Sequence, residues 1–400
     1  MEDVRRTHII TNDTYVKTSF LYRGLAIVLL LFIIPLESLL GNYIEDWGGS
    51  LVYEIQKCRT YGGDQFFKVI SWLGTSFTFF IIFPAIYNLY DTRRAIKAIL
   101  IISFSMYALS ILSLIYQEPR PYWKSSDIRG VNCERGFGNP APETMISSVL
   151  YTTLVVEFLH ERKHLSKYLF YGGTIALLVL LGFSRLYLGE NYPHQIIIGL
   201  FYGFIYVTLC FAFDKQILKL SIQSCFNWTK NRKNVFYWFA VIMFMLLGAV
   251  AVFDVITLSN NVSIDWKKNA LKHCDANYSV GGGASFYMSS WIFYNLGIVS
   301  GNMHSSKTVT LFWWHTNWIK RWTRVIISSG LCVGIYFLFN LIPTYDTTTS
   351  YVWKYVIPEF LMAYLYTGIL PIIFVKSKLG TNIAEEDEDE ELMSIVQQDD

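Results

Sequence analysis

The stretch Ser-Arg-Leu-Tyr-Leu-Gly-Glu-Asn-Tyr-Pro-His-Gln, residues 184–195, separates two long apolar segments of a 400-residue chain. It places Arg185 directly at the end of the first segment. A charged side chain at the edge of a membrane-length apolar run is costly unless it is paired or hydrogen-bonded. The stretch therefore predicts a polar site in which another part of the chain supplies a partner for Arg185.

The composition of the chain predicts the all-α class. Hydrophobic residues make up 53%, aromatic residues 17% and charged residues only 16%, which excludes a single soluble domain. Apolar runs of about 20 residues, long enough to cross a bilayer, recur along the chain. We predict a polytopic helical membrane protein with about ten transmembrane helices, with no sign of nucleic-acid binding. The expected spans are 24–41, 70–89, 95–116, 142–160, 166–184, 194–213, 235–258, 284–301, 325–343 and 352–375.

Two further motifs precede the stretch at 184–195. Arg120-Pro121 stands in Glu-Pro-Arg-Pro-Tyr-Trp, and Pro140-Ala141-Pro142-Glu143 follows it. In this order, the three motifs resemble the signatures of the type-2 phosphatidic acid phosphatase superfamily, which includes glucose-6-phosphatase. Those signatures read Lys, six residues, Arg-Pro; then Pro-Ser-Gly-His; then Ser-Arg, five residues, His, three residues, Asp. The resemblance implies a phosphatase-type helical bundle as the core of the chain.

Several signature positions depart from the family pattern. The resemblance implies that the third-signature histidine attacks phosphorus and the second-signature histidine protonates the leaving group, and both roles need a ring nitrogen. An amide and a carboxylate replace them, and losing a covalent nucleophile costs on the order of a million-fold in rate. We therefore expect no intact catalytic residue. The departures are Ser113 for lysine, Ala141 for serine, Pro142 for glycine, Glu143 and Asn191 for the two histidines, and Gln195 for aspartate.

The resemblance leaves Arg120, Ser184 and Arg185 at phosphate-binding positions. We expect both arginines to converge with Glu143 and Asn191 at the same ends of their helices. An unpaired carboxylate near the membrane boundary is unfavourable, so Glu143 should lie within salt-bridge reach of one arginine and stand where phosphate would bind. The expected ligand classes are a lipid phosphate or a phosphate anion.

For the other polar residues we expect structural rather than catalytic roles. We expect His194 to be a hydrogen-bonded residue at a helix start and Glu190 to be a solvated loop carboxylate. His160 and His164 do not complete a metal motif, so we expect no metal and no cofactor. The acidic residues inside expected spans lack obvious partners in the sequence, and they are Glu37, Glu157, Asp254 and Glu359.

The distribution of Lys and Arg predicts the orientation. These residues are more frequent in the loops on the side of the termini, so both termini should be cytosolic and the degenerate site lumenal or extracellular. An integral protein of the endoplasmic reticulum or plasma membrane fits this orientation. The sequons at Asn261 and Asn277 would then be glycosylated. That oxidising side would allow one disulfide among Cys58, Cys133 and Cys274.

The expected organisation has five parts. The acidic tail, with seven consecutive acids at 385–391, has too few apolar groups to fold alone. It is either a solvated tail or a contact for an adaptor or partner protein through 385–400. The parts are a cytosolic arm (1–23), a phosphatase-like transmembrane bundle (24–213), a basic cytosolic loop (214–234), a C-terminal transmembrane region (235–380) and the tail (381–400).

Three functions fit the sequence. The first is a catalytically inactive family member that binds a lipid or phosphate ligand or a membrane partner. The second is an active phosphomonoesterase, facing the lumen, on a lipid phosphate or sugar phosphate. The third is a transporter. Under the first, Asn191→His alone should stay inactive, whereas restoring all of positions 113, 141, 142, 143 and 191 should give measurable hydrolysis.

Overall fold

The computed structural model describes residues 24, 28, 45–159, 164–214, 216–218, 232–258, 262–275, 278, 280–309, 316–343 and 346–381. Within these ranges the regular structure is helical throughout, which confirms the all-α prediction. Residues 45–57 form a helix. The first half continues with α3 (Tyr61–Trp72), η1 (Ser76–Thr78), α4 (Phe79–Leu89), α5 (Thr92–Tyr116), α6 (Pro121–Lys124), α7 (Pro142–Leu159), α8 (His164–Tyr187) and α9 (Pro193–Ala212). The second half contains α11 (Arg232–Leu258), α12 (Ile264–Ala270), α13 (Gly283–Tyr287), η2 (Met288–Ser290), α14 (Trp291–Ser305), α15 (Trp318–Asn340), α16 (Thr347–Tyr351), η3 (Val352–Val356), α17 (Ile357–Tyr364), η4 (Leu365–Ile369) and α18 (Leu370–Lys376).

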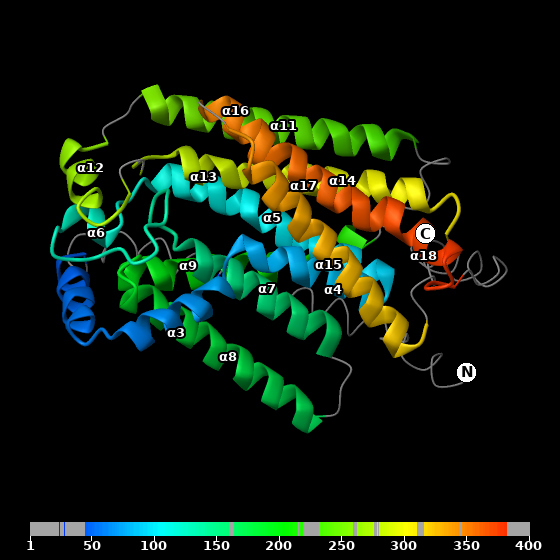
Figure 1. Cartoon of the computed structure of the whole chain (residues 1–400), viewed down its shortest axis with the longest axis horizontal. Coiled ribbons are helices and arrows are strands. Elements are labelled where there is room, and N and C mark those ends of the chain that lie inside the picture. The colour runs from blue at the N-terminus through cyan, green and yellow to red at the C-terminus, as the bar shows by residue number, and fades with distance from the viewer. Residues whose placement is uncertain are drawn as a thin grey trace.

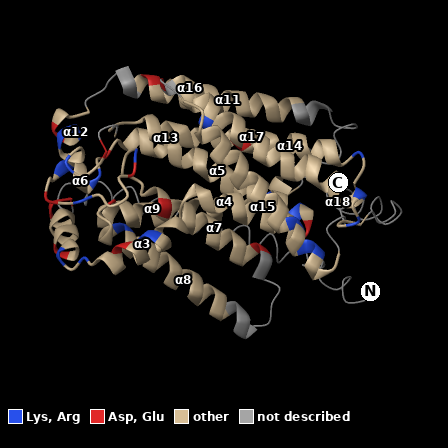
Figure 2. Cartoon of the chain, viewed as in Figure 1, with Lys and Arg blue, Asp and Glu red and all other residues tan. Residues whose placement is uncertain are grey.

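The long helices run lengthwise through an elongated bundle (Figure 1). The short helices α6 and α12 lie together at one end, and α18 lies at the other. Charged residues gather toward the two ends, whereas the middle of the bundle is mostly uncharged (Figure 2). This distribution is the one expected when the middle crosses a hydrocarbon layer, where an unpaired charge is unfavourable.

Among the described residues, six helices are long and apolar enough to cross a membrane, and they match the expected spans that begin at 95, 166, 194, 235, 325 and 352. The expected span 70–89 instead belongs to a pair, α3 with η1 and α4, bent by 57° at a short break. The expected span 284–301 is divided into α13, η2 and α14. The first expected span lies almost wholly outside the described residues, so a total of ten stays a prediction. The arm 1–23, both lumenal sequons, and all of the tail except Thr381 also lie outside them.

Small residues bring α9 close to α7. A Cβ at Gly203 would come within 2.9 Å of the Met145 carbonyl oxygen and closer still to the Ser148 hydroxyl. A Cβ at Gly199, one turn earlier, would come within 2.8 Å of the Ala141 carbonyl oxygen. Such close approach of backbones is how membrane helices associate without a hydrophobic driving force. It fixes the start of α7 against the start of α9, where two of the signature motifs lie.

A buried ion cluster joins α5 and α7 near the other end of the bundle. The Lys97 Nζ lies 2.6 Å from a carboxylate oxygen of Glu157 and 2.6 Å from one of Asp214. Lys97 and Glu157 are both buried. The expectation that Glu157 lacks a partner was therefore wrong, because its partner is 60 positions earlier in the chain and on a different helix.

Replacing Lys97 with Met should destabilise the protein strongly. The two carboxylates would then face each other without a cation, and breaking a buried ion pair from one side typically costs about 3–5 kcal/mol. Thermal unfolding of the purified protein in detergent measures the loss. Adding Glu157→Gln to Lys97→Met should recover part of it, and equal stability of Lys97→Met and wild type would contradict the cluster's role.

Candidate functional site

The loop of residues 125–141 carries an acidic side chain, Glu134, that is fixed from several directions. The adjacent Cys133 forms a disulfide with Cys274, one of the pairings that the sequence allowed. The hydroxyls of Tyr122 and Tyr278 each donate to the Glu134 carbonyl oxygen over 2.6 Å. Neighbouring backbone and covalent contacts thus determine where the Glu134 carboxylate can point.

Arg185, in the last turn of α8, is fully buried and receives the Glu134 carboxylate as its main partner. Its two terminal nitrogens donate to the two oxygens of Glu134, the first over 2.7 Å. The same guanidinium also donates to the Ser71 hydroxyl over 2.7 Å and lies 3.1 Å from Glu143. A two-pronged contact of this kind is the strongest form of an arginine–carboxylate pair.

Arg120, immediately before α6, reaches the same carboxylate from the other side. Its Nη1 lies 3.4 Å from Oε2 of Glu134 and donates over 3.1 Å to the Glu190 carbonyl oxygen. Its Nε donates to the Gly136 carbonyl oxygen over 2.9 Å. The Glu134 carboxylate therefore lies between the two arginines that the sequence placed at phosphate-binding positions.

Glu190 is a second internal carboxylate at this site. It is fully buried and accepts hydrogen bonds from the backbone N–H groups of Asn132 (2.7 Å) and Glu134 (3.3 Å). Its carboxylate also lies 3.9 Å from Arg120. The expectation of a solvated loop carboxylate was wrong, because the loop of residues 125–141 folds over Glu190 and supplies its hydrogen-bond donors.

Asn191 and Gln195 form a neutral network at the position of the expected nucleophile. Asn191 donates to the Gly138 carbonyl oxygen over 2.8 Å, and its side-chain oxygen accepts from Arg185 over 3.2 Å. Gln195 donates to the Pro119 carbonyl oxygen over 3.0 Å. His194 contacts Glu118 over 3.0 Å at the start of α9, which confirms the expectation of a hydrogen-bonded helix-start histidine.

The other departures from the signatures are engaged elsewhere. The Ser113 hydroxyl lies 2.8 Å from that of Ser285. The Ala141 N–H donates to the Gln195 carbonyl oxygen over 3.1 Å, and α7 begins at Pro142, which has no N–H. Ser184 is buried and its hydroxyl donates to Leu181 within its own helix. These groups hold the backbone together at the positions where phosphate ligands were expected.

The structure brings Arg120, Glu143, Arg185 and Asn191 together, as the order of the motifs predicted. Glu143 pairs with Arg185, but the anion shared by both arginines is Glu134, which the sequence reasoning missed. No spacing pattern connects Glu134 to arginines 14 and 51 positions away. The available signal was an acidic residue beside a loop cysteine, in the segment that links the first two motifs.

The two internal carboxylates have opposite electrostatics. Burial alone would raise the pKa of Glu134, but the positive charges of Arg185 and Arg120 outweigh it and lower the pKa from 4.5 to about 2. Burial raises the pKa of Glu190 above its ordinary value, and ionised Glu134 adds to the rise. Glu134 therefore stays ionised at neutral pH and acts as the counter-ion of the arginines.

The arrangement binds charge but offers no phosphorus nucleophile at the signature position. The Asn191 amide is neither basic nor nucleophilic. Among the residues that the structure describes, no group of three His, Cys, Asp or Glu side chains could hold a metal ion. Arg120, Arg185, Glu134 and Asn191 are engaged with one another in ion pairs and hydrogen bonds.

Comparison with known proteins agrees with the motifs. Residues 94–219 match the model of the PAP2 superfamily. The chain is 23% identical over 207 residues to the glucose-6-phosphatase catalytic subunit 1 of Felis catus, and equally to that of Bos taurus. These alignments cover 46% of this chain and 57% of each relative, so the chain spans little more than half the length of the relatives it matches. A crystal structure described as a transmembrane PAP2 type phosphatidylglycerolphosphate phosphatase from Bacillus subtilis is 21% identical, with a TM-score of 0.42, covering 48% of this chain and 96% of that one.

Replacing Glu134 with Gln should destabilise the protein by about 3–5 kcal/mol, because it leaves two buried arginines without their shared anion. Thermal unfolding in detergent measures the effect. Asp127→Asn is the matched control, because Asp127 is an exposed acid in the same loop. The interpretation fails if Glu134→Gln and Asp127→Asn unfold at the same temperature.

Acid should remove the contribution of Glu134. Because its pKa is lowered from 4.5 to about 2 in the folded protein, its stabilisation is complete above pH 4.5 and disappears as the pH falls toward 2. The difference in stability between wild type and Glu134→Gln should therefore shrink over that range. Glu190 has a raised pKa and acts in the opposite direction, and ionised Glu134 is one cause of that rise, so both proteins are compared in a Glu190→Gln background. A difference that stays constant from pH 6 to pH 3 would contradict the assignment.

Proposed function

Because residues 94–219 belong to the PAP2 superfamily, we propose that this chain is a membrane-embedded member that does not hydrolyse phosphate esters and acts by binding. The observation that carries the proposal is the position of Glu134. Its carboxylate contacts Arg185 and Arg120, the two arginines at phosphate-binding signature positions. A substrate phosphate would have to displace an anion that belongs to the protein itself.

The nucleophile position supports the same proposal. Asn191 uses its amide to join Gly138 and Arg185 and has no lone pair basic enough to attack phosphorus. Glu143 at the expected acid position is paired with Arg185. Losing general acid–base help costs roughly two to four powers of ten, and losing the nucleophile costs more.

We propose the orientation predicted from the basic residues, with both termini in the cytosol and the site facing the lumen or the outside. The Cys133–Cys274 disulfide supports this side, because disulfides persist in oxidising compartments. The endoplasmic reticulum and the plasma membrane both provide such a face. We also propose that the acidic segment 385–400 contacts a partner protein. This proposal rests only on the charge of the segment.

Phosphate release from a panel of lipid and sugar monophosphates tests the absence of catalysis. The purified chain should release no more phosphate than a sample without protein, whereas an active glucose-6-phosphatase in the same detergent should release it readily. Turnover by the unmodified chain that disappears in an Arg185 variant would overturn the proposal and favour an active phosphatase. Substrate movement across sealed vesicles would favour a transporter.

Restoring catalysis should need one change more than the signatures suggest. The set Ser113→Lys, Ala141→Ser, Pro142→Gly, Glu143→His and Asn191→His rebuilds the motif residues but leaves Glu134 between the arginines. We expect measurable hydrolysis only when Glu134→Gln is added to this set. Equal activity with and without Glu134→Gln would show that Glu134 does not obstruct the phosphate position.

A further inference from the structure

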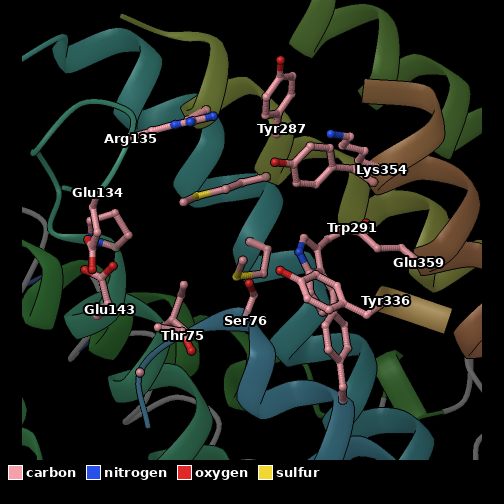
Figure 3. A pocket seen from close by; sticks show the side chains of 18 of the residues that line it. Thr75, Ser76, Glu134, Arg135, Glu143, Tyr287, Trp291, Tyr336, Lys354 and Glu359 are labelled. Carbon is pink, nitrogen blue, oxygen red and sulfur yellow. The ribbon is translucent and has the colours of Figure 1, made fainter. Parts of the chain in front are cut away.

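A cavity of about 320 Å³ is lined on one side by Arg120, Glu134 and Glu143 of the degenerate site and extends to the C-terminal helices. Figure 3 shows Glu134 and Glu143 on one side and Lys354 and Glu359 on the other, with Trp291 and Tyr336 along the wall. Most of the lining is apolar or aromatic. A cavity of this size with mainly apolar walls and a few polar groups is typical of a small-ligand site.

An acidic and a basic side chain on the far side of the cavity form no ion pair with each other among the described residues. Glu359, in α17, is 5% exposed, and its Oε2 has no hydrogen-bond partner among the described residues. The nearby Ser290 hydroxyl donates to the Tyr287 carbonyl oxygen over 2.6 Å. Lys354, five positions earlier, lines the same cavity, and within the described part of the chain it forms no side-chain hydrogen bond or ion pair. A buried carboxylate oxygen without a donor calls for an explanation, and a ligand that supplies the donor is one.

The backbone that carries these charges is irregular. Val352–Val356 is a π-helix, and α17 begins directly after it. A π-helical turn inside an α-helix is uncommon and occurs frequently at functional sites. Here the π-helix contributes both Lys354 and Tyr355 to the cavity.

A second cation reaches the cavity from the opposite region of the chain. Arg135 follows Glu134 in the loop of residues 125–141, and its side chain extends toward Tyr287 and Lys354 in Figure 3. In the described ranges, Arg135 has no ion pair or hydrogen bond. An arginine and a lysine near tyrosine hydroxyls match a phosphate group, whose several oxygens accept from more than one donor.

We propose that this cavity binds a phosphate–ammonium zwitterion, whose phosphate lies between Arg135 and Lys354 and whose ammonium group donates to Glu359. A simple anion would meet the unpaired Glu359 carboxylate, and a simple cation would meet Lys354 and Arg135. A zwitterion satisfies both. The faces of Trp291 and Tyr336 add attraction for an ammonium group. The proposal rests on the proposed binding function, and it moves phosphate recognition away from Arg120 and Arg185.

The same chemistry occurs in free phosphoethanolamine and in the headgroup of phosphatidylethanolamine. The intact protein in nanodiscs separates these sources. One arm titrates soluble phosphoethanolamine into nanodiscs of phosphatidylcholine, with inorganic phosphate and ethanolamine as separate probes. The other arm compares thermal stability in nanodiscs that contain phosphatidylethanolamine with stability in nanodiscs that contain phosphatidylglycerol. A response in either arm supports the site and identifies the source.

The variants Lys354→Met and Glu359→Gln locate the binding. Each should weaken binding about tenfold or more, as loss of a hydrogen bond to a charged group does. Lys376→Met and Glu54→Gln are matched controls, since both residues are exposed and neither lines the cavity, and they should bind as wild type does. Lys354 is only half-buried, so Lys354→Met keeps the test decisive if Glu359→Gln does not fold.

Three outcomes would overturn the proposal: no response in either arm, binding unchanged in both variants, or inorganic phosphate binding as tightly as phosphoethanolamine with no effect of Glu359→Gln. Phosphate release during the titration would count against the proposed absence of catalysis. If that release depended on Lys354, it would still support this site. Binding without release supports both proposals.

Discussion

The pairing of Arg185 with Glu134 is the contact on which this end of the molecule depends. Two guanidinium groups are buried here, one at the end of α8 and one before α6, and buried charges persist only when they are paired and hydrogen-bonded. Glu134 meets this requirement for both. Its position requires the loop of residues 125–141 to fold inward over Glu190. In that conformation the carbonyl oxygens of Gly136 and Gly138 accept hydrogen bonds from Arg120 and Asn191, respectively. The conformation of the loop is thus consistent with the charge balance as well as with its disulfide and tyrosine contacts.

An internal anion changes what such a site can bind. A phosphate in solution competes with a carboxylate that is covalently held next to the arginines, and a tethered group acts at a high effective concentration. The charge balance at the arginines and the missing nucleophile therefore both act against phosphate chemistry at this site. The cluster stabilises the fold, and in the proposed function the same contacts oppose the entry of a phosphate between the arginines.

Some of this could be predicted from sequence because it depends on local properties. Apolar length identified the helices that begin at residues 92, 168 and 193, and the order of the motifs brought Arg120 and Arg185 together. The loop residues could not be placed in this way. Loops have no hydrophobic periodicity. The spacing of residues therefore predicts neither the inward orientation of Glu134 nor the burial of Glu190. The two arginines in the motifs indicated that an anion was needed, and the motifs pointed to Glu143. The anion that contacts both arginines is instead Glu134, a loop residue outside every motif.

The disulfide between Cys133 and Cys274 means that the site does not belong to the phosphatase-like region alone. Tyr278, which holds the Glu134 carbonyl, follows α12 and lies far beyond residue 219, where the PAP2 match ends. A fragment that stops after α9 would retain every signature motif, both arginines and Glu134, but would lack Cys274 and Tyr278, which hold the loop in place. Only Tyr122 would still hold the Glu134 carbonyl. The second half of the chain therefore helps to position the counter-ion of the first.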